Sequence, residues 1–307
     1  MPILWGRRKA HSAVHAEIWA VAEAAELGYA EAGPPVKRPL APIARLAPVA
    51  VLALGAGLAA APAAHAAETA CWFEGGVVVV PAEVMGVAGD YVLDTATAHT
   101  QLGETQAQGA GFADTALKGE VRIGGMRLTG QPVAVAGLDM RTGALPTPIA
   151  GVIGADVLRA FVVDVRFAPC RVVLSRPGEA PPFGRATALP LTWTGDTPTV
   201  AAAVSDGGRT LSGPFAPATG GERAVRLADD LAAAPGASKP QELYPYGVAR
   251  PRLRALSFAG ALSENLPAGL LKAQDGGPAG EIGTPVLARY RLRFDFPNGR
   301  LLLAPDG

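Results

Sequence analysis

One carboxylate in the chain stands where reactive groups are often found. Asp94 follows the apolar run 91–93 and is followed by Thr95, Ala96 and Thr97. Loops that leave the end of a strand often carry binding and catalytic residues. An aspartate in such a loop can act as a base toward a water, or it can cap the loop by accepting hydrogen bonds from backbone N–H groups. The sequence leaves both roles open for Asp94.

The sequence has few residues that could support serine-type catalysis, a metal centre or nucleic-acid binding. His99 is the only histidine after residue 66, and no G-x-S-x-G elbow accompanies it, so a Ser-His-Asp site is not indicated. The chain contains no H-E-x-x-H and no C-x-x-C motif, and we predict neither a metal centre nor a cofactor. Basic and acidic residues both number 27. This balance argues against a nucleic-acid partner, which favours basic proteins.

The elements that must position Asp94 belong to an internal repeat. Residues 151–176 align without a gap with residues 280–305, at an offset of 129. The identical pairs are Gly151/Gly280, Ile153/Ile282, Gly154/Gly283, Val157/Val286, Leu158/Leu287, Phe167/Phe296, Arg171/Arg300 and Leu174/Leu303. Two copies at this spacing predict two similar lobes of roughly 110–120 residues, because a solenoid has shorter and more numerous units.

Each copy has the pattern of short elements. We expect a turn at Gly-x-Ile-Gly, a short helical turn at 156–159 and at 285–289, and then a two-stranded hairpin. The earlier part of each lobe alternates like strands, and residues 224–234 have the best helical pattern. The predicted fold class is mainly β, with two similar lobes and a few short helices.

Two motifs make the chain resemble the retropepsin-like and pepsin-like aspartic peptidases over residues 75–305. One is an apolar strand ending in Asp-Thr-Gly, here YVLDTATAHT; the other is an apolar-apolar-Gly strand before a short helix, here GVIGADVLRAF and EIGTPVLARY. The resemblance implies the acid protease fold, with lobes at 67–185 and 186–307. It implies a structural role beside the catalytic loops for Gly151, Ile153, Gly154, Ile282 and Gly283.

Members of this family use two carboxylates, one from each lobe, that share a proton and act on a water. The resemblance implies that the catalytic loop of lobe one contains Asp94 and Thr95. In lobe two, the equivalent loop contains Ala218, Thr219 and Gly220. Lobe one keeps the acid but has Ala96 in place of the usual glycine. Lobe two keeps the glycine but lacks the acid. We therefore expect hydrolysis to be strongly impaired, because losing a catalytic group can cost several orders of magnitude in rate.

The family also has a flap, for which residues 121–136 are the candidate, with a turn at Gly124-Gly125 or at Thr129-Gly130. The edge of such a hairpin can hold an extended peptide by strand addition. The predicted partner is an extended peptide or protein segment between the lobes. The protein is expected to be a monomer.

The first 66 residues have the pattern of a targeting segment. An apolar stretch at 46–67 follows Lys37, Arg38 and Arg45 and contains Ala64-His65-Ala66, an A-x-A cleavage site. We predict a signal peptide at 36–66, cut near Ala66, and export to the periplasm or beyond. An uncleaved anchor is the alternative, and this segment is the only predicted membrane contact. Residues 1–35 are either an N-terminal extension or the product of a start codon placed too early.

The two cysteines, Cys71 and Cys170, form an even pair in a chain predicted to be exported. An oxidising compartment favours one disulfide between them, and two free buried thiols are the alternative.

The sequence favours two classes of function. The first is an exported aspartic peptidase in which Asp94 is the single retained carboxylate and activity is weak or lost. The second is a non-catalytic pseudo-peptidase that binds a peptide or protein. A scaffold without any ligand is the third possibility.

Overall fold

The computed structural model describes residues 67–206, 209–228, 241–243, 249–272 and 274–306. The predicted extension at 1–35 and the predicted signal peptide at 36–66 lie outside these residues. Among the described residues, no helix has the length and apolar character needed to cross a membrane.

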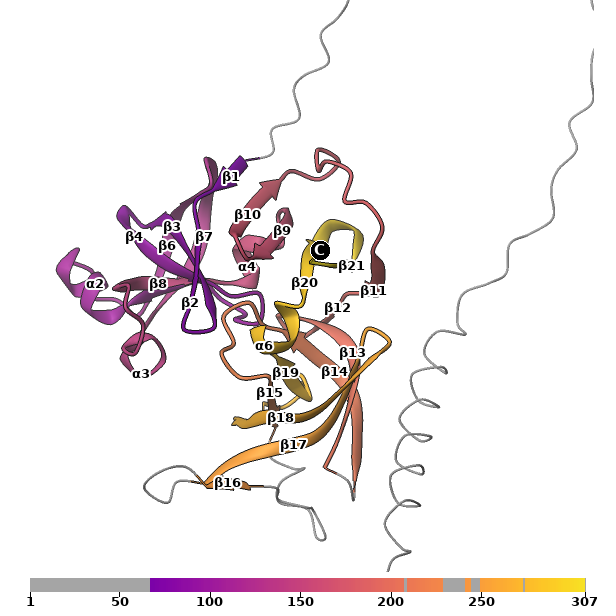
Figure 1. Cartoon of the computed structure of the whole chain (residues 1–307). Helices are drawn as coiled ribbons and strands as arrows, with labels where there is room; N and C mark the ends of the chain where they lie inside the picture. Colours follow the sequence, from indigo (N-terminus) through magenta and orange to yellow (C-terminus); the bar gives the residue numbers. More distant parts are fainter. Residues whose placement is uncertain (1–66, 207–208, 229–240, 244–248, 273, 307) are drawn as a thin grey trace, which may run out of the picture.

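Two sheets with the same topology form the two lobes (Figure 1). The order β3-β4-β8-β5-β7-β6 in the first matches the order β13-β14-β19-β15-β18-β17 in the second. An additional pairing joins β3 to β6 and β13 to β17, so each sheet curls into a barrel. Parallel pairs also correspond, β4 with β8 and β14 with β19. The predicted pair of similar lobes is confirmed.

The seven-stranded sheet of lobe one consists of β2 (Trp72–Glu74), β3 (Val77–Val84), β4 (Val87–Leu93), β5 (Gln101–Gly103), β6 (Ala116–Ile123), β7 (Met126–Ala136) and β8 (Ile149–Ile153). The eight-stranded sheet of lobe two consists of β12 (Thr192–Thr194), β13 (Thr197–Ser205), β14 (Thr210–Pro217), β15 (Val225–Ala228), β16 (Gln241–Leu243), β17 (Ala249–Phe258), β18 (Ala261–Leu271) and β19 (Gly280–Ile282).

A third sheet, with six strands, joins the lobes in the order β1-β10-β9-β20-β21-β11. Its strands are β1 (Ala67–Thr69), β9 (Val162–Phe167), β10 (Cys170–Ser175), β11 (Thr187–Pro190), β20 (Tyr290–Asp295) and β21 (Arg300–Pro305). The hairpins β9–β10 and β20–β21 are the repeated hairpins expected from the sequence, and Gly299 makes the second turn in the left-handed region. In Figure 1 this sheet lies between and above the two barrels.

The helices are short, as predicted: α2 (Glu104–Gly109), α3 (Asp139–Thr142), α4 (Ala155–Leu158), α6 (Thr284–Leu287) and the 3-10 turn η1 (Phe296–Asn298). Two expectations about local structure were wrong. Residues 151–153 of Gly-x-Ile-Gly are strand rather than turn, because β8 is fully buried between β4 and β5. Residues 225–228 of the expected helix are strand β15, where pairing with β18 and β19 outweighs helical propensity.

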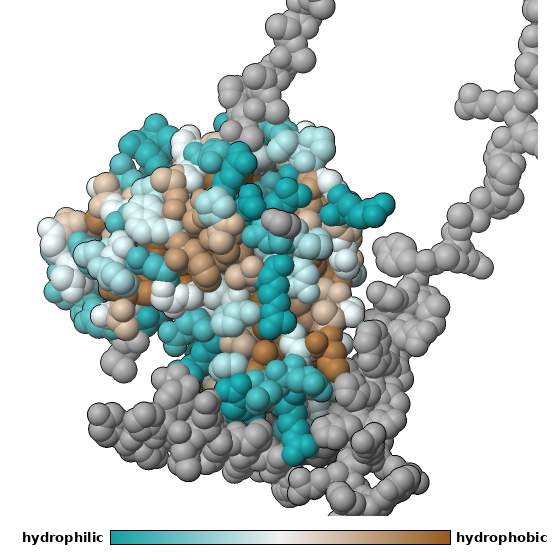
Figure 2. Space-filling model, viewed as in Figure 1, coloured by the Kyte–Doolittle hydropathy of each residue, from teal (hydrophilic) through white to brown (hydrophobic). Residues whose placement is uncertain are grey.

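One hydrophobic core runs from each barrel into the joining sheet. Its members on the inner face of that sheet include Val163, Val165, Leu292 and Phe294. Two large apolar side chains are clearly exposed in the described part of the chain, Phe73 and Leu270. Figure 2 shows hydrophilic and apolar residues interspersed over the face in view.

The structure joins Cys71 and Cys170 in a disulfide, which ties the start of the described chain to the beginning of β10. Among the described residues no free cysteine remains. The alternative of two buried thiols is therefore not what the structure contains.

Candidate functional site

Equivalent strands of the two lobes deliver the two loops predicted from the sequence. β4 ends at Leu93 and leads into Asp94, and β14 ends at Pro217 and leads into Ala218. The backbone N–H of Asp94 donates to the Ile153 carbonyl at 3.0 Å. The N–H of Ala218 donates to the Ile282 carbonyl at 2.8 Å. Asp94 and Ala218 therefore occupy equivalent places beside the repeated strand.

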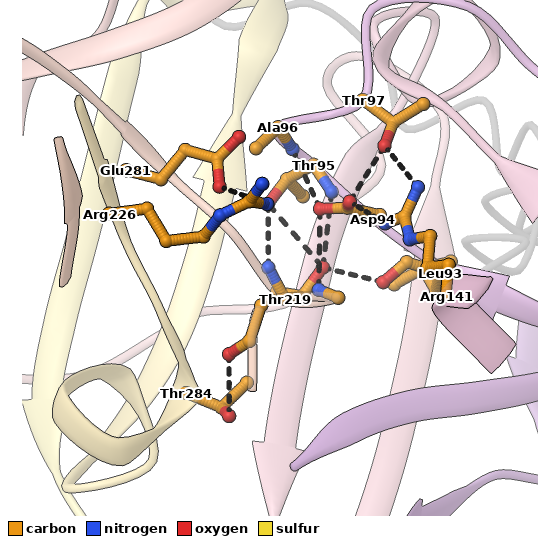
Figure 3. Close-up of polar contacts among 12 residues, drawn as sticks. Leu93, Asp94, Thr95, Ala96, Thr97, Arg141, Thr219, Arg226, Glu281 and Thr284 are labelled. Atoms are coloured by element: carbon orange, nitrogen blue, oxygen red, sulfur yellow. Dashed lines mark hydrogen bonds and ion pairs between the residues drawn. The ribbon is translucent and has the colours of Figure 1, made fainter. Parts of the chain in front are cut away.

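Thr95 and Thr219 lock the two loops together with reciprocal hydrogen bonds (Figure 3). The N–H of Thr95 donates to Thr219 Oγ1 at 3.1 Å, and the N–H of Thr219 donates to Thr95 Oγ1 at 3.2 Å. Thr219 Oγ1 also donates to the Leu93 carbonyl at 2.7 Å, and Thr95 Oγ1 donates to the Pro217 carbonyl. Both threonines are fully buried. This symmetry supports the alignment of Thr219 with Thr95 and of Ala218 with Asp94.

The repeated glycines are required where the strands pass the loops. A Cβ on Gly154 would lie 2.8 Å from the Thr97 carbonyl oxygen, and one on Gly283 would lie 2.0 Å from the Arg223 carbonyl oxygen. Any side chain at either position would overlap the backbone of its own lobe's loop. The structure thus places Gly154 and Gly283, with the neighbouring Ile153 and Ile282, directly beside the loops.

The unusual residues of the two loops face each other in complementary pairs. A Cβ on Gly220 would lie 2.7 Å from both Cβ and Cγ of Asp94, so the Asp94 side chain needs a glycine at position 220. Across the same interface, Ala96 and Ala218 pack together with Ala216 in a small apolar cluster. Ala96 and Ala218 therefore lie against each other where the two loops meet.

Every acceptor position of the Asp94 carboxylate is occupied. Oδ1 accepts from the N–H of Ala96 at 3.0 Å and from the N–H of Gly220 at 3.3 Å. Oδ2 accepts from Thr97 Oγ1 at 2.7 Å and from the guanidinium of Arg141. A carboxylate has about four lone-pair sites. In this arrangement no site remains for a water.

Arg141 is the residue that neutralises Asp94. It lies on α3, after the last long strand of lobe one, and also donates to Thr97 Oγ1 at 3.0 Å. The side chain of Asp94 is only 6% exposed, whereas that of Arg141 is 34% exposed. Burial by itself would raise the pKa of Asp94, but the charge of Arg141 and the hydrogen bonds from Thr97, Ala96 and Arg141 outweigh it and lower this pKa.

A second acid, Glu281, lies close enough to Asp94 for their charges to interact. Glu281 is on β19, in register with Ala216 of β14 and with Arg226 of β15. Arg226 Nη1 donates to Glu281 Oε2 at 3.1 Å. Burial and the negative charge of Asp94 raise the pKa of Glu281, despite the opposing effect of Arg226 and Arg141. Figure 3 shows Asp94 with Arg141 on one side of the threonine pair and Glu281 with Arg226 on the other.

Sequence reasoning missed Arg141, Arg226 and Glu281. Glu281 had a detectable signal, since its counterpart in the repeat alignment is the apolar Val152. An acid at that place interrupts an otherwise apolar strand. Arg141 had no comparable signal, because its pairing with Asp94 depends on how the chain returns 47 residues later.

The expected flap is a hairpin, but its turn does not approach Asp94. β6 and β7 pair up to Ile123 and Met126, so the turn is at Gly124-Gly125. A Cβ on Gly124 would contact Leu174, Thr69 and the Ala67 carbonyl oxygen. These residues belong to the sheet that joins the lobes. The alternative turn at Thr129-Gly130 lies within strand β7.

Among the described residues, no group of three or more His, Cys, Asp or Glu side chains is arranged to hold a metal ion. His99 lies beside Asp196, with 3.8 Å between Nε2 and Oδ2, and both side chains are largely exposed. The site therefore consists of two carboxylates, two guanidinium groups and the buried threonine pair.

No family model matches the chain, and no curated protein matches it in sequence. Among solved structures, the chain is similar to an aspartic proteinase from Irpex lacteus, with 16% identity and a TM-score of 0.49. The aligned part covers 78% of this chain and 97% of that one.

Proposed function

We propose that this protein is an aspartic-peptidase-like protein that holds an extended peptide or protein segment between its lobes without hydrolysing it. The observation that carries the proposal is the state of Asp94. Its carboxylate is buried, paired with Arg141 and hydrogen-bonded at every acceptor position.

Hydrolysis by two carboxylates needs a shared proton and a water held between them. Asp94 has a lowered pKa and stays ionised, which makes it a weak base. The methyl group of Ala218 provides neither a proton nor a hydrogen bond to a scissile carbonyl. The site therefore has no group that can activate the water as a base, and none that can donate a proton to the scissile carbonyl.

Binding without hydrolysis fits the groups that remain accessible. The side chains of Arg141 and Arg226 are 34% and 41% exposed, while the carboxylates beneath them are mostly buried. A guanidinium has five N–H donors, and the contacts to Asp94, Thr97 and Glu281 use only part of each set. The remaining donors can bind the carbonyl groups of an extended segment.

Export is the second part of the proposal, and the Cys71–Cys170 disulfide supports it, since such bonds persist in oxidising compartments.

Residual hydrolysis is the second candidate function, and one observation favours it. The environments of Asp94 and Glu281 move their pKa values in opposite directions. Divergent pKa values within one site are typical of a base and an acid. In this alternative Glu281 replaces the missing acid of lobe two. Any cleavage would then be lost in Glu281→Gln as well as in Asp94→Asn.

The proposal is tested by incubating the full chain with a random decapeptide library and identifying the retained peptides by mass spectrometry. We expect a retained set that is recovered intact. Arg226→Gln should reduce retention, and Arg122→Gln, which removes an exposed charge from the outside of lobe one, should not. Failure to retain any peptide would contradict binding. Recovery of cleaved peptides that depend on Asp94 and Glu281 would favour the second candidate.

A further inference from the structure

A pocket of about 290 Å³ lies on the outer face of the six-stranded sheet. Strands β1, β9 and β10 of lobe one and β20 of lobe two form its floor, and residues 181–183 of the connection between the lobes cover it. It shares no residue with the Asp94 site. We infer that this pocket is a binding site for a small oxyanion, a carboxylate or a phosphate, attached to a compact apolar group.

The centre of the pocket is a symmetric position of the repeat. Asp164 and Arg293 are equivalent residues, 129 positions apart, and they pair in register where β9 meets β20. Arg293 Nε and Nη2 donate to the two oxygens of Asp164 at 2.5 and 2.6 Å. The Arg293 side chain is only 8% exposed. The pocket therefore contains a buried cation, held rigidly by a bidentate pair.

Positive charge exceeds negative charge around this pair. Four arginines and two carboxylates, Glu68 and Asp164, line the pocket, and a third carboxylate, Asp306, pairs with Arg166 at 2.9 Å. Arg166 and Arg171 face each other directly across β9 and β10, an arrangement of like charges that destabilises a sheet unless counter-charges are near. Arg171 pairs with Glu68 at 2.7 Å, an ion pair in which both side chains are more than half exposed.

Arg291 has the least satisfied guanidinium in the pocket. Within the described part of the chain it forms no ion pair with a carboxylate; its Nη2 donates to the Phe183 carbonyl oxygen, and its Nε is buried without a hydrogen-bond partner. A buried donor without a partner is unfavourable, because it has lost its hydrogen bonds to water. A small turn of this side chain, of the kind that accompanies many binding events, would present Nε and one Nη to a ligand. Two parallel N–H groups match a carboxylate or phosphate.

The other lining residues suit a compact apolar group. Pro181, Pro182, Phe183 and Val173 line the pocket beside the arginines. Phe183 lies under both Arg291 and Arg293, whose guanidinium carbons are 4.5 and 4.7 Å from its ring centroid. The volume is near the lower end of the range for small-molecule sites, about 300–1,000 Å³. A ligand of this kind would contact both lobes and so stabilise their junction.

The test is isothermal titration of the full chain with benzoate, acetate and inorganic phosphate, in chloride buffer at constant ionic strength. We expect saturable binding, with benzoate tighter than acetate if the natural ligand is a carboxylate and phosphate tightest if it is a phosphate. Arg291→Gln should weaken binding about tenfold, the effect of one charge-assisted hydrogen bond. Arg127→Gln is the matched control, since it removes an exposed charge from lobe one, away from the pocket.

Arg166→Gln gives a second variant on the pocket rim, with a side chain that is 39% exposed, in case Arg291→Gln does not fold. It should also weaken binding while Arg127→Gln does not. The inference is overturned if none of the three anions binds more tightly than chloride. It is equally overturned if the pocket variants and the control weaken binding by the same factor.

Discussion

The complementary pairing of Asp94 with Gly220, and of Ala218 with Ala96, makes a sharp prediction about Gly220→Ala. The new methyl group would lie 2.7 Å from Asp94 Cβ and Cγ, well inside normal contact distance. The backbone at Gly220 is not in the left-handed region, so the collision alone determines the cost. Overpacking of this kind destabilises a core by about 1–3 kcal/mol, and the change would also push the Gly220 N–H from Asp94 Oδ1.

The same substitution should be tolerated when Asp94 is shortened. Asp94→Ala with Gly220→Ala recreates, on one side of the interface, the arrangement that Ala218 and Ala96 already form on the other. We expect Gly220→Ala to cost less than about 1 kcal/mol in the Asp94→Ala background. The coupling free energy between the two positions is then about 1–2 kcal/mol, which is within the range measured for residues in contact.

The assay is a double-mutant cycle measured by urea unfolding of the wild type, both single variants and the double variant. Equal slopes of free energy against urea concentration are the control, since they show that the unfolded states are comparable. An equal cost of Gly220→Ala in both backgrounds would refute the steric explanation. Ala216→Gly serves as an additional control, because it loosens the alanine cluster without touching Asp94.

Three further predictions concern stability. Cys71→Ser with Cys170→Ser opens a link between residues 99 apart and should lower the free energy of unfolding by about 2–5 kcal/mol; unchanged thermal unfolding without reductant would contradict the disulfide. Thr219→Val removes the partners of the Thr95 N–H and the Leu93 carbonyl. Each buried group left unpaired costs about 1–3 kcal/mol, so a change below 1 kcal/mol in chemical unfolding would argue against the threonine lock. Asp94 has a lowered pKa in the folded state, so its ionised form stabilises the protein above the usual aspartate pKa of about 3.9, and this contribution is lost as the pH falls through the lowered value. The stability difference between wild type and Asp94→Asn should therefore be constant above about pH 5 and shrink below about pH 4; a difference that does not change with pH would contradict the ion pair.

The sequence was sufficient for the two-lobe architecture, because the repeat at an offset of 129 records it directly. The hairpin at 290–305 also followed from local signals, since Asn298-Gly299 specifies its turn. Strand β15 could not be read from its own residues. Its alanine-rich neighbourhood favours a helix, and only pairing with β18 and β19 makes it a strand.

The candidate site was predictable in its motif but not in its electrostatics. The sequence singled out Ala96 and Ala218, and the structure adds that these two alanines pack together with Ala216. The ion pair of Asp94 with Arg141 could not be predicted, because it depends on the path of the chain through β7 to α3. The position of the turn at Gly124-Gly125 against the neighbouring sheet could not be predicted either, because it depends on contacts with that sheet rather than on the residues of the turn.

Arg141 pairs with Asp94, and we propose that this makes Asp94 unavailable for hydrolysis. The most direct test is cleavage of a denatured protein substrate by the full chain between pH 3 and pH 7, with peptides counted by mass spectrometry beside Asp94→Asn. The account predicts the same background in both proteins at every pH. Cleavage by the wild type that disappears in Asp94→Asn would contradict it and show that Asp94 can activate a water.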